Sequence, residues 1–174
     1  MNLPKLSLVL GGASSGKSSF AEGLVLGSGL APVYIATAQV WDAEMAAKVA
    51  AHRAQRGPGW RTVEEPLDIA AVLAGVTADE AVLIDCATLW LTNLILTDAD
   101  PDAVLAGLTT ALAACPAAVV IVSNEVGMGI VPDNALARRF RAAQGGLNRD
   151  LATRAGLVVA VMAGLPLVLK GTLP

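Results

Sequence analysis

The chain has 174 residues; 55% are hydrophobic, 16% are charged, and the formal net charge at pH 7 is −3. This length fits a single domain, 1–174, with enough apolar side chains for a core. The acidic balance and the lack of a basic run argue against a nucleic-acid partner, and no apolar stretch reaches the ~18–20 residues of a membrane span. Cys86 and Cys115 lack paired spacing, which favours buried thiols in a reducing cytoplasm.

A phosphate-binding loop follows the first predicted strand, residues 6–11. Gly11, Gly16, Lys17 and Ser18 fill the pattern G-x-x-x-x-G-K-[ST], and a helix-compatible stretch, 19–25, comes next. Because glycine permits backbone conformations that a side chain forbids, successive N–H groups can surround a phosphate at the positive end of that helix. Lys17 is predicted to reach the β- and γ-phosphates, and the Ser18 hydroxyl to bind Mg²⁺. The structural alternative is a glycine-rich turn into an ordinary helix.

The rest of the chain alternates short apolar strands with helices. Strands are predicted over 33–36, 60–64, 81–85, 119–122, 158–162 and 167–170, and helices over 42–56, 66–73, 89–96, from the 98–102 loop to about 114, and 134–155. This alternation predicts an α/β fold with a mainly parallel sheet and helices on both faces. Together with the phosphate-binding motif, it predicts a fold of the P-loop NTPase type.

Polar residues follow several of these strands where they end. Thr37–Gln39, Asp85 and Asn124-Glu125 all come at carboxyl ends. In a parallel sheet these ends form one rim, on which ligands bind. Asp85 is interpreted as the Mg²⁺-associated acid of a P-loop enzyme; the alternative is an aspartate that caps the next turn.

His52 is the single histidine of the chain. On the 42–56 helix it shares one face with Met45, Val49 and Arg56, with Arg53 beside it. A histidine at the edge of the core is the structural interpretation. The functional one is a nucleophile or phosphate ligand, because a largely neutral imidazole can attack phosphorus and guanidinium groups stabilise phosphate charge.

Two further stretches have both structural and functional interpretations. The loop Asn124–Gly129 contains two glycines, so it either approaches a ligand closely or simply connects a strand to a helix. Arg138, Arg139 and Arg141 form a cationic cluster on the predicted 134–155 helix, which is usually a solvated face.

Taken together, these stretches resemble the bifunctional adenosylcobinamide kinase / adenosylcobinamide-phosphate guanylyltransferase family of cobalamin biosynthesis. The resemblance spans Gly11-Gly12-Ala13-x-Ser15-Gly16-Lys17-Ser18, Tyr34–Ala38, Glu44-Met45, His52-Arg53, Trp60–Glu64, Asp85-Cys86, Leu89–Asn93, Asn124–Pro132, Leu136–Arg138, Phe140-Arg141 and Leu147-Asn148. Ser14 and Gly146 depart from it, because the family commonly has arginine at both positions.

The resemblance implies a RecA-like P-loop fold, a homotrimer and two reactions. ATP or GTP phosphorylates adenosylcobinamide, and GTP then gives its GMP, through a GMP–histidine intermediate on His52, to adenosylcobinamide phosphate. Lys17 would be the second catalytic residue, and Ser18 and Asp85 would hold Mg²⁺. The implied nucleotide contacts are Gly11, Gly12, Ala13, Ser14, Ser15, Gly16, Lys17, Ser18, Thr37, Ala38, Gln39, Arg53, Ala54, Gln55, Arg56, Glu64 and Asp85.

Two other functions remain open on the sequence. One is a P-loop small-molecule kinase without guanylyl transfer, in which His52 has a structural or phosphate-binding role. The other is a nucleotide-gated binding module that changes a partner surface when GTP is bound.

Overall fold

The fold is given by a computed structural model that describes residues 2–39, 47, 50, 56–97 and 101–174. Its seven strands are β1 (Leu6–Gly11), β2 (Ala31–Ala36), β3 (Arg61–Glu64), β4 (Glu80–Asp85), β5 (Ala118–Asn124), β6 (Leu157–Met162) and β7 (Leu165–Lys170). Its helices are α1 (Lys17–Gly27), α3 (Ile69–Ala74), α4 (Ala87–Leu96), α5 (Pro101–Ala114) and α6 (Ala135–Arg154). The helix predicted over 42–56 lies mostly outside the described residues.

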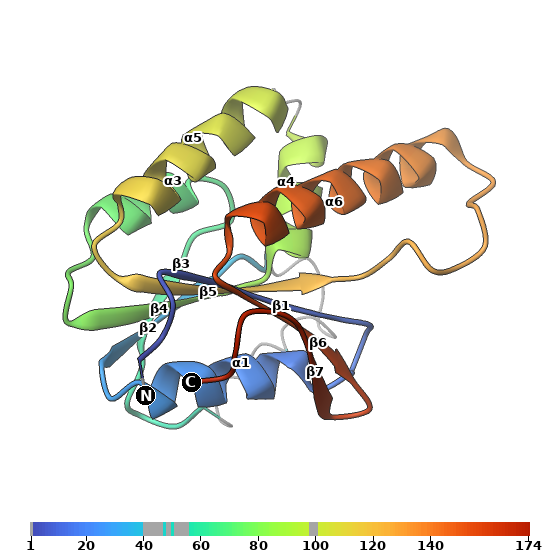
Figure 1. Ribbon diagram of the computed structural model, residues 1–174. Coiled ribbons are helices and arrows are strands. Elements are labelled where there is room, and N and C mark those ends of the chain that lie inside the picture. Colours follow the sequence, from blue (N-terminus) through green and yellow to red (C-terminus); the bar gives the residue numbers. More distant parts are fainter. Residues whose placement is uncertain (1, 40–46, 48–49, 51–55, 98–100) are drawn as a thin grey trace.

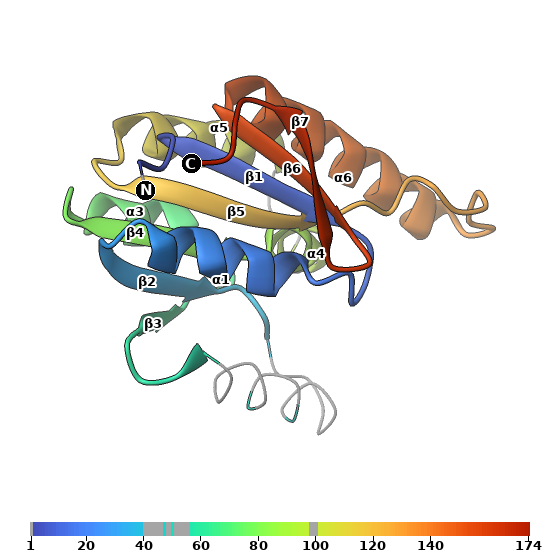
Figure 2. The ribbon, with the colours of Figure 1, turned by 60° about the horizontal axis from the view of Figure 1, so that its bottom comes forward.

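The strands form one sheet in the order β3-β2-β4-β5-β1-β6-β7. All neighbouring pairs are parallel except β6 and β7, which form an antiparallel hairpin. β5 therefore lies between β1, which feeds the P-loop, and β4, which ends at Asp85. Helices α3, α4, α5 and α6 cover one face of the sheet, and α1 covers the other (Figures 1 and 2). The predicted α/β fold with helices on both faces is confirmed.

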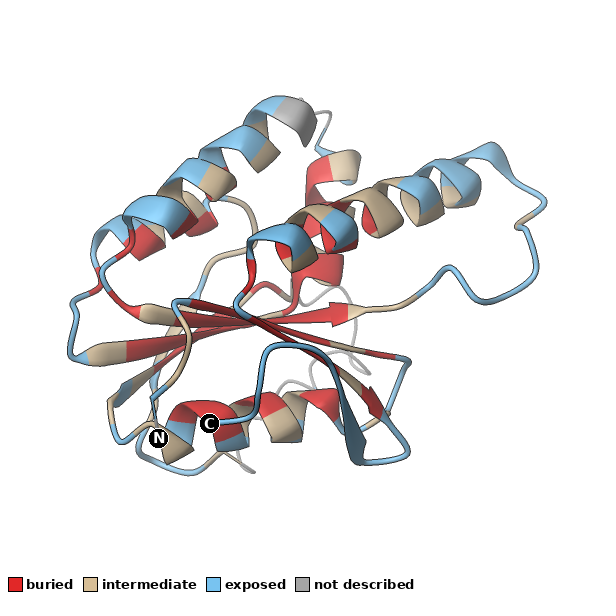
Figure 3. Cartoon of the chain, in the orientation of Figure 1, coloured by how far each residue is buried: buried red, intermediate tan, exposed pale blue. Residues whose placement is uncertain are grey.

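Apolar side chains from the two faces of the strands form two cores. Leu8, Ile35 and Ile121 point toward the larger helical layer, and Val9, Leu83 and Val122 point toward α1. The central strands are buried along almost their whole length, as Figure 3 shows. Continuous apolar runs such as Val82-Leu83-Ile84 are the sequence signature of strands covered on both faces. Among the described residues, no helix has the length and apolarity to cross a membrane.

Helix starts depend on capping residues. Asn134 accepts a hydrogen bond from the N–H of Ala137 and caps α6, which begins at Ala135, one residue after the predicted start. α3 begins at Ile69, three residues later than predicted, because Asp68 accepts a hydrogen bond from Ala71 and is the capping residue. The prediction of a helix from Pro66 was wrong for its first residues, since the Glu65 carboxylate accepts the N–H groups of Leu67 and Asp68 in a turn.

Candidate active site

The P-loop is a strand–loop–helix unit with the backbone shape that its glycines predict. Gly16 has φ +91°, a left-handed conformation that glycine adopts without strain. α1 begins directly after it, at Lys17, so the amino end of the helix faces the loop. The Lys17 side chain is buried, and its Nζ donates a hydrogen bond to the Gly12 carbonyl, 2.9 Å away. A cation is thus held in the glycine-rich loop at the amino end of a helix, which is an arrangement that binds phosphate.

Most of the remaining P-loop residues are accessible to solvent. Gly12, Ala13 and Ser14 are exposed and Ser15 and Ser18 are half-buried. Ser14 has φ +53°, unusual for a residue with a side chain. The Ser15 hydroxyl is buried and has no hydrogen-bond partner among the described residues. Buried hydroxyls are ordinarily paired, so this one is suited to a ligand oxygen.

The strand ends that the sequence places on one rim do lie on one rim. Gly11 is in register with Asn124 of β5, and the N–H of Glu125 donates to the Gly11 carbonyl at 3.1 Å. Asp85 is in register with Ala36 on one side and Val122 on the other. Because two inter-strand spacings separate β1 from β4, their backbones are ~10 Å apart. Asp85 therefore lies on the same rim as the P-loop, with β5 between them.

Asp85 does not cap the helix that follows it. The N-cap of α4 is Cys86, whose sulfur accepts a hydrogen bond from the N–H of Leu89 at 3.5 Å. Burial raises the pKa of the Cys86 thiol, so that sulfur stays protonated. The Asp85 carboxylate is half-buried and free of a capping role, which supports its interpretation as a ligand-facing acid.

Thr37 is fully buried and joins β2 to β4. Its hydroxyl donates to the Cys86 carbonyl at 2.8 Å and accepts from the Cys86 N–H at 2.7 Å. Its own carbonyl accepts from the amide of Asn93 at 2.8 Å. The side chain predicted to contact nucleotide is thus engaged with backbone next to Asp85. Ala38, Gln39 and Glu64 lie at the same edge, the first two half-buried and Glu64 exposed.

Tyr34 is a member of this site that sequence reasoning did not identify. Its hydroxyl donates to Asp85 Oδ2 at 3.1 Å, and burial, followed by the charge of Asp85, raises its pKa, so it remains a protonated donor. Its ring contacts Arg56, whose guanidinium carbon is 3.5 Å from the ring centroid, and Trp60, at 6.0 Å. An apolar strand with one tyrosine gives no local signal of such contacts.

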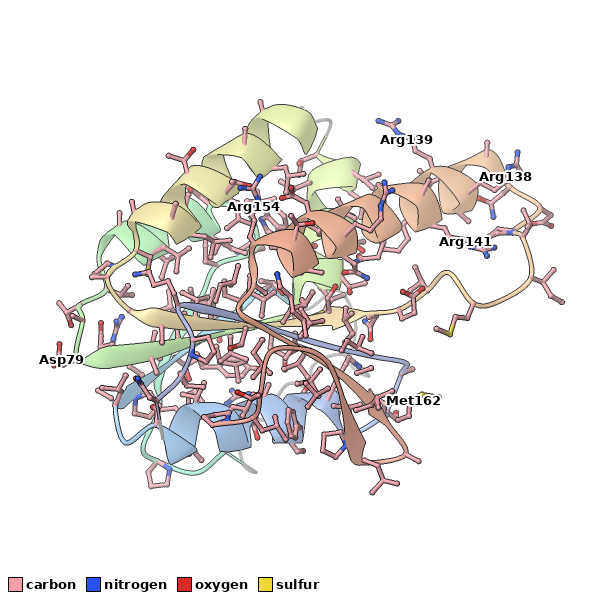
Figure 4. All side chains as sticks on the ribbon, viewed as in Figure 1. Asp79, Arg138, Arg139, Arg141, Arg154 and Met162 are labelled. Atoms are coloured by element: carbon pink, nitrogen blue, oxygen red, sulfur yellow. The ribbon has the colours of Figure 1, made fainter. Side chains whose placement is uncertain are left out.

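The loop between β5 and α6 projects beyond the sheet and is braced by arginines. Arg141 donates to the carbonyls of Gly127 and Ile130, and Arg138 to those of Pro132 and Asp133. In Figure 4, Arg138 and Arg141 lie by this loop while Arg139 points away from it. Two of the three arginines therefore have structural partners. Residues of this loop and of α6, including Arg149, line a groove of about 590 Å³.

Several predicted site residues lie outside the described residues: His52, Arg53, Ala54 and Gln55. Arg56, the last residue of that group, is described and lies against Tyr34. Hydroxyl and carboxylate oxygens are the ligands that Mg²⁺ prefers. The half-buried Ser18 and Asp85 are oxygen donors of this kind on the same rim, so the residues present fit a magnesium ion held partly by nucleotide phosphates.

Comparison with solved structures supports the fold. The flagellar accessory protein FlaH from Methanocaldococcus jannaschii aligns with a TM-score of 0.55 at 12% identity, over 98% of this chain and 80% of that one. An ATPase from the type III secretion system of pathogenic bacteria aligns with a TM-score of 0.51 at 11% identity, over 92% of this chain and 51% of that one. The predicted P-loop NTPase fold is confirmed.

Comparison with protein families and curated proteins identifies the relatives. Residues 7–169 match the family described as cobinamide kinase / cobinamide phosphate guanyltransferase. The bifunctional adenosylcobalamin biosynthesis protein CobP of Pseudomonas aeruginosa is 50% identical over 169 residues, which cover 94% of this chain and 96% of the relative. CobU of Escherichia coli is 42% identical over 179 residues, covering 94% and 98%. The chain belongs to the cobinamide kinase / cobinamide phosphate guanyltransferase family, as the sequence predicted.

Proposed function

We propose that this chain phosphorylates adenosylcobinamide and then converts the product to adenosylcobinamide-GDP. The observation that carries the proposal is the shared rim: the P-loop and Asp85 lie on one sheet edge, in a chain that matches the family from residue 7 to residue 169. A cradle for triphosphate and an acid across from it are the parts that phosphoryl transfer needs.

In the kinase step, the aminopropanol hydroxyl of adenosylcobinamide attacks the γ-phosphorus of ATP or GTP. The bond from γ-phosphorus to the bridging oxygen breaks, the nucleoside diphosphate leaves, and the hydroxyl proton is released. Lys17 stabilises the charge on the terminal phosphates from inside the loop. Mg²⁺, when bound by Ser18 and Asp85, would neutralise further phosphate charge.

In the transferase step, a ring nitrogen of His52 attacks the α-phosphorus of GTP and pyrophosphate leaves. The phosphate of adenosylcobinamide phosphate then attacks the same phosphorus, the P–N bond breaks, and neutral imidazole is restored. A covalent intermediate lets one site serve two acceptors in turn. Arg56 follows His52 by four residues in the sequence and packs on the Tyr34 ring. Its positive charge supports this step. Arg53, Ala54 and Gln55 are proposed nucleotide contacts of the same segment.

Labelling with GTP that carries ³²P at the α-phosphate tests the intermediate. We expect acid-labile label on the wild-type protein, chase of that label into adenosylcobinamide-GDP on addition of the corrinoid phosphate, and none on His52→Ala. Lys17→Met should lose nucleotide binding itself. GTP binding therefore distinguishes the two variants, because His52→Ala lacks only the nucleophile whereas Lys17→Met lacks a working phosphate-binding loop. A folded wild-type protein that binds GTP, phosphorylates cobinamide and never carries label would be a kinase alone.

A homotrimer in the cytoplasm is part of the proposal. β7 is exposed along its length and presents Leu165, Leu167 and Leu169 at 57–71% exposure. An apolar edge strand of this kind is usually covered by another chain. The free thiols of Cys86 and Cys115 are compatible with a reducing compartment. Sedimentation analysis should give a trimer, and Leu167→Glu should shift it toward monomer; a monomeric wild type would contradict this part.

A further inference from the structure

Tyr34 contacts two parts of the site that lie far apart in the sequence. Its hydroxyl meets Asp85, 51 residues later, and its ring meets Arg56 and Trp60 on either side of the turn 57–59. We propose that Tyr34 is a positioning residue that fixes the Asp85 carboxylate for magnesium–nucleotide binding and ties Arg56 to that carboxylate. This inference rests on the proposed function, because it assigns Asp85 to the metal–nucleotide complex.

The sheet register explains why the tyrosine reaches the acid. Ala36 is in register with Asp85, and Tyr34 precedes Ala36 by two residues on the neighbouring strand. Side chains two residues apart in a strand project from the same face. Tyr34 and Asp85 therefore form a diagonal cross-strand pair on the α1 face, at a separation within reach of an aromatic side chain.

The hydroxyl engages one oxygen of the carboxylate and leaves the other for a ligand. The bond goes to Oδ2, at 3.1 Å, and Tyr34 is only 6% exposed, so the donor is rigidly held. A fixed hydrogen bond to one oxygen limits rotation of the carboxylate. Such partners of metal-binding groups typically change metal affinity or activity by ~10–100-fold when they are removed.

The ring has a separate task. The Arg56 guanidinium carbon lies 3.5 Å from the ring centroid, which is a close cation–π contact. Trp60 meets the same ring edge-on, with an interplanar angle of 87°. The two residues that flank the 57–59 turn are thus packed on one buried side chain. Arg56 is held at the rim by the same residue that orients Asp85.

Two variants separate the hydroxyl from the ring. Tyr34→Phe removes the hydrogen bond and keeps the platform for Arg56, whereas Tyr34→Leu removes both. GTP affinity is measured by calorimetry with Mg²⁺ and with EDTA, and the ratio of the two affinities reports the metal contribution without any turnover. Thermal unfolding of each variant checks that it is folded.

For Tyr34→Phe we expect the Mg²⁺-dependent gain in GTP affinity to fall roughly tenfold, with the EDTA value unchanged. For Tyr34→Leu we expect the same loss and, in addition, slower formation of the GMP adduct at saturating Mg²⁺. A Phe variant whose magnesium dependence stays within twofold of wild type would overturn the role of the hydroxyl. A Leu variant with no further loss would overturn the link to Arg56.

The same measurements distinguish this inference from the proposed function. If the wild-type protein binds Mg²⁺–GTP but forms no GMP adduct, the transferase proposal fails while the Phe result still decides the role of the hydroxyl. If the adduct forms normally and the Phe variant has wild-type magnesium dependence, the positioning role fails alone. Tyr34→Leu with equal losses in Mg²⁺ and in EDTA would indicate a purely structural residue and would also overturn the proposal.

Discussion

The N–H of Gly164 donates a hydrogen bond to the carbonyl oxygen of Ser15, 2.9 Å away, and so joins the turn of the β6–β7 hairpin to the P-loop. A Cβ at Gly16 would lie 3.2 Å from the Gly164 Cα, so the two backbones are in close contact. The hairpin at the sheet edge therefore supports the phosphate cradle from outside. Mutations in this turn should alter nucleotide binding indirectly, by changing the backbone of the P-loop.

Gly164→Ala tests this support. Gly164 has φ +78°, and a side chain in that conformation costs about 1–2 kcal/mol. We expect that loss of stability together with a several-fold weaker GTP affinity, measured by denaturant unfolding and calorimetry. Gly29→Ala is the matched control, because Gly29 follows the carboxyl end of α1, has φ +74°, and has nothing within 4 Å of an added Cβ. It should lose similar stability and bind GTP as wild type does; equal binding by both variants would show that the turn does not support the loop.

Gly11→Ala should damage the cradle by overpacking. A Cβ on Gly11 would lie 2.6 Å from the carbonyl oxygen of Val161, a backbone atom of the neighbouring strand that has little room to move. We expect a loss of about 1–3 kcal/mol in the free energy of unfolding and strongly reduced nucleotide binding.

Gly23→Ala is the control for this substitution, because Gly23 lies exposed in α1 with nothing within 4 Å of a new Cβ. It should stabilise the protein by up to ~1 kcal/mol and leave binding intact. A Gly11→Ala protein as stable as wild type would contradict the packing argument.

Arg141→Met should loosen the loop that follows β5. The guanidinium donates to the carbonyls of Gly127 and Ile130, and removing it leaves the loop without these crosslinks. Hydrogen exchange of the amides between 126 and 133 should accelerate several-fold, with little change in the melting temperature. Arg139→Met, which alters an exposed arginine that points away from the loop, should leave exchange unchanged (Figure 4). Equal protection in both variants would rule out the bracing role.

Glu80→Gln should reduce the loss of stability at acid pH. The backbone N–H of Thr77, and next the Arg61 side chain, lower the pKa of the Glu80 carboxyl below its ordinary value of 4.5. A carboxyl whose pKa is lowered on folding contributes stability that is present above its unfolded value and lost as pH falls through the folded one. Urea unfolding at pH 7 and below pH 4.5 should therefore show a smaller difference for the variant.

Arg61→Met is the companion to this variant. Arg61 donates to Glu80 at 2.7 Å, but the hydrogen bond from the Thr77 backbone is the larger influence on the carboxyl. The Met variant should keep part of the acid dependence that Glu80→Gln removes, because the Thr77 hydrogen bond is still made. If Arg61→Met removed all of it, the ion pair would be the main cause.

Structural features that depend on residues close together in the sequence were predictable. The glycine spacing in the P-loop and the position of Asp85 at a strand end depend on neighbouring residues, and both hold in the structure. The start of α3 was misplaced because the Glu65 carboxylate accepts the N–H groups of Leu67 and Asp68 in a turn, while Asp68 accepts the N–H of Ala71 and caps the helix. His52 remains a prediction from the sequence and the family, since its segment lies outside the described residues.

The sequence by itself determined the family, the phosphate-binding loop and a parallel sheet with its polar rim, because motif spacing and apolar periodicity are properties of the chain. Only the tertiary structure decided that β5 separates the loop from Asp85, that Tyr34 holds that acid, and that the β6–β7 turn supports Ser15. The Tyr34–Asp85 and Ser15–Gly164 contacts join residues 51 or more positions apart. Their geometry follows from strand order, which is set by packing the whole sheet against its helices, and the apolar pattern within one strand does not specify which strands become its neighbours.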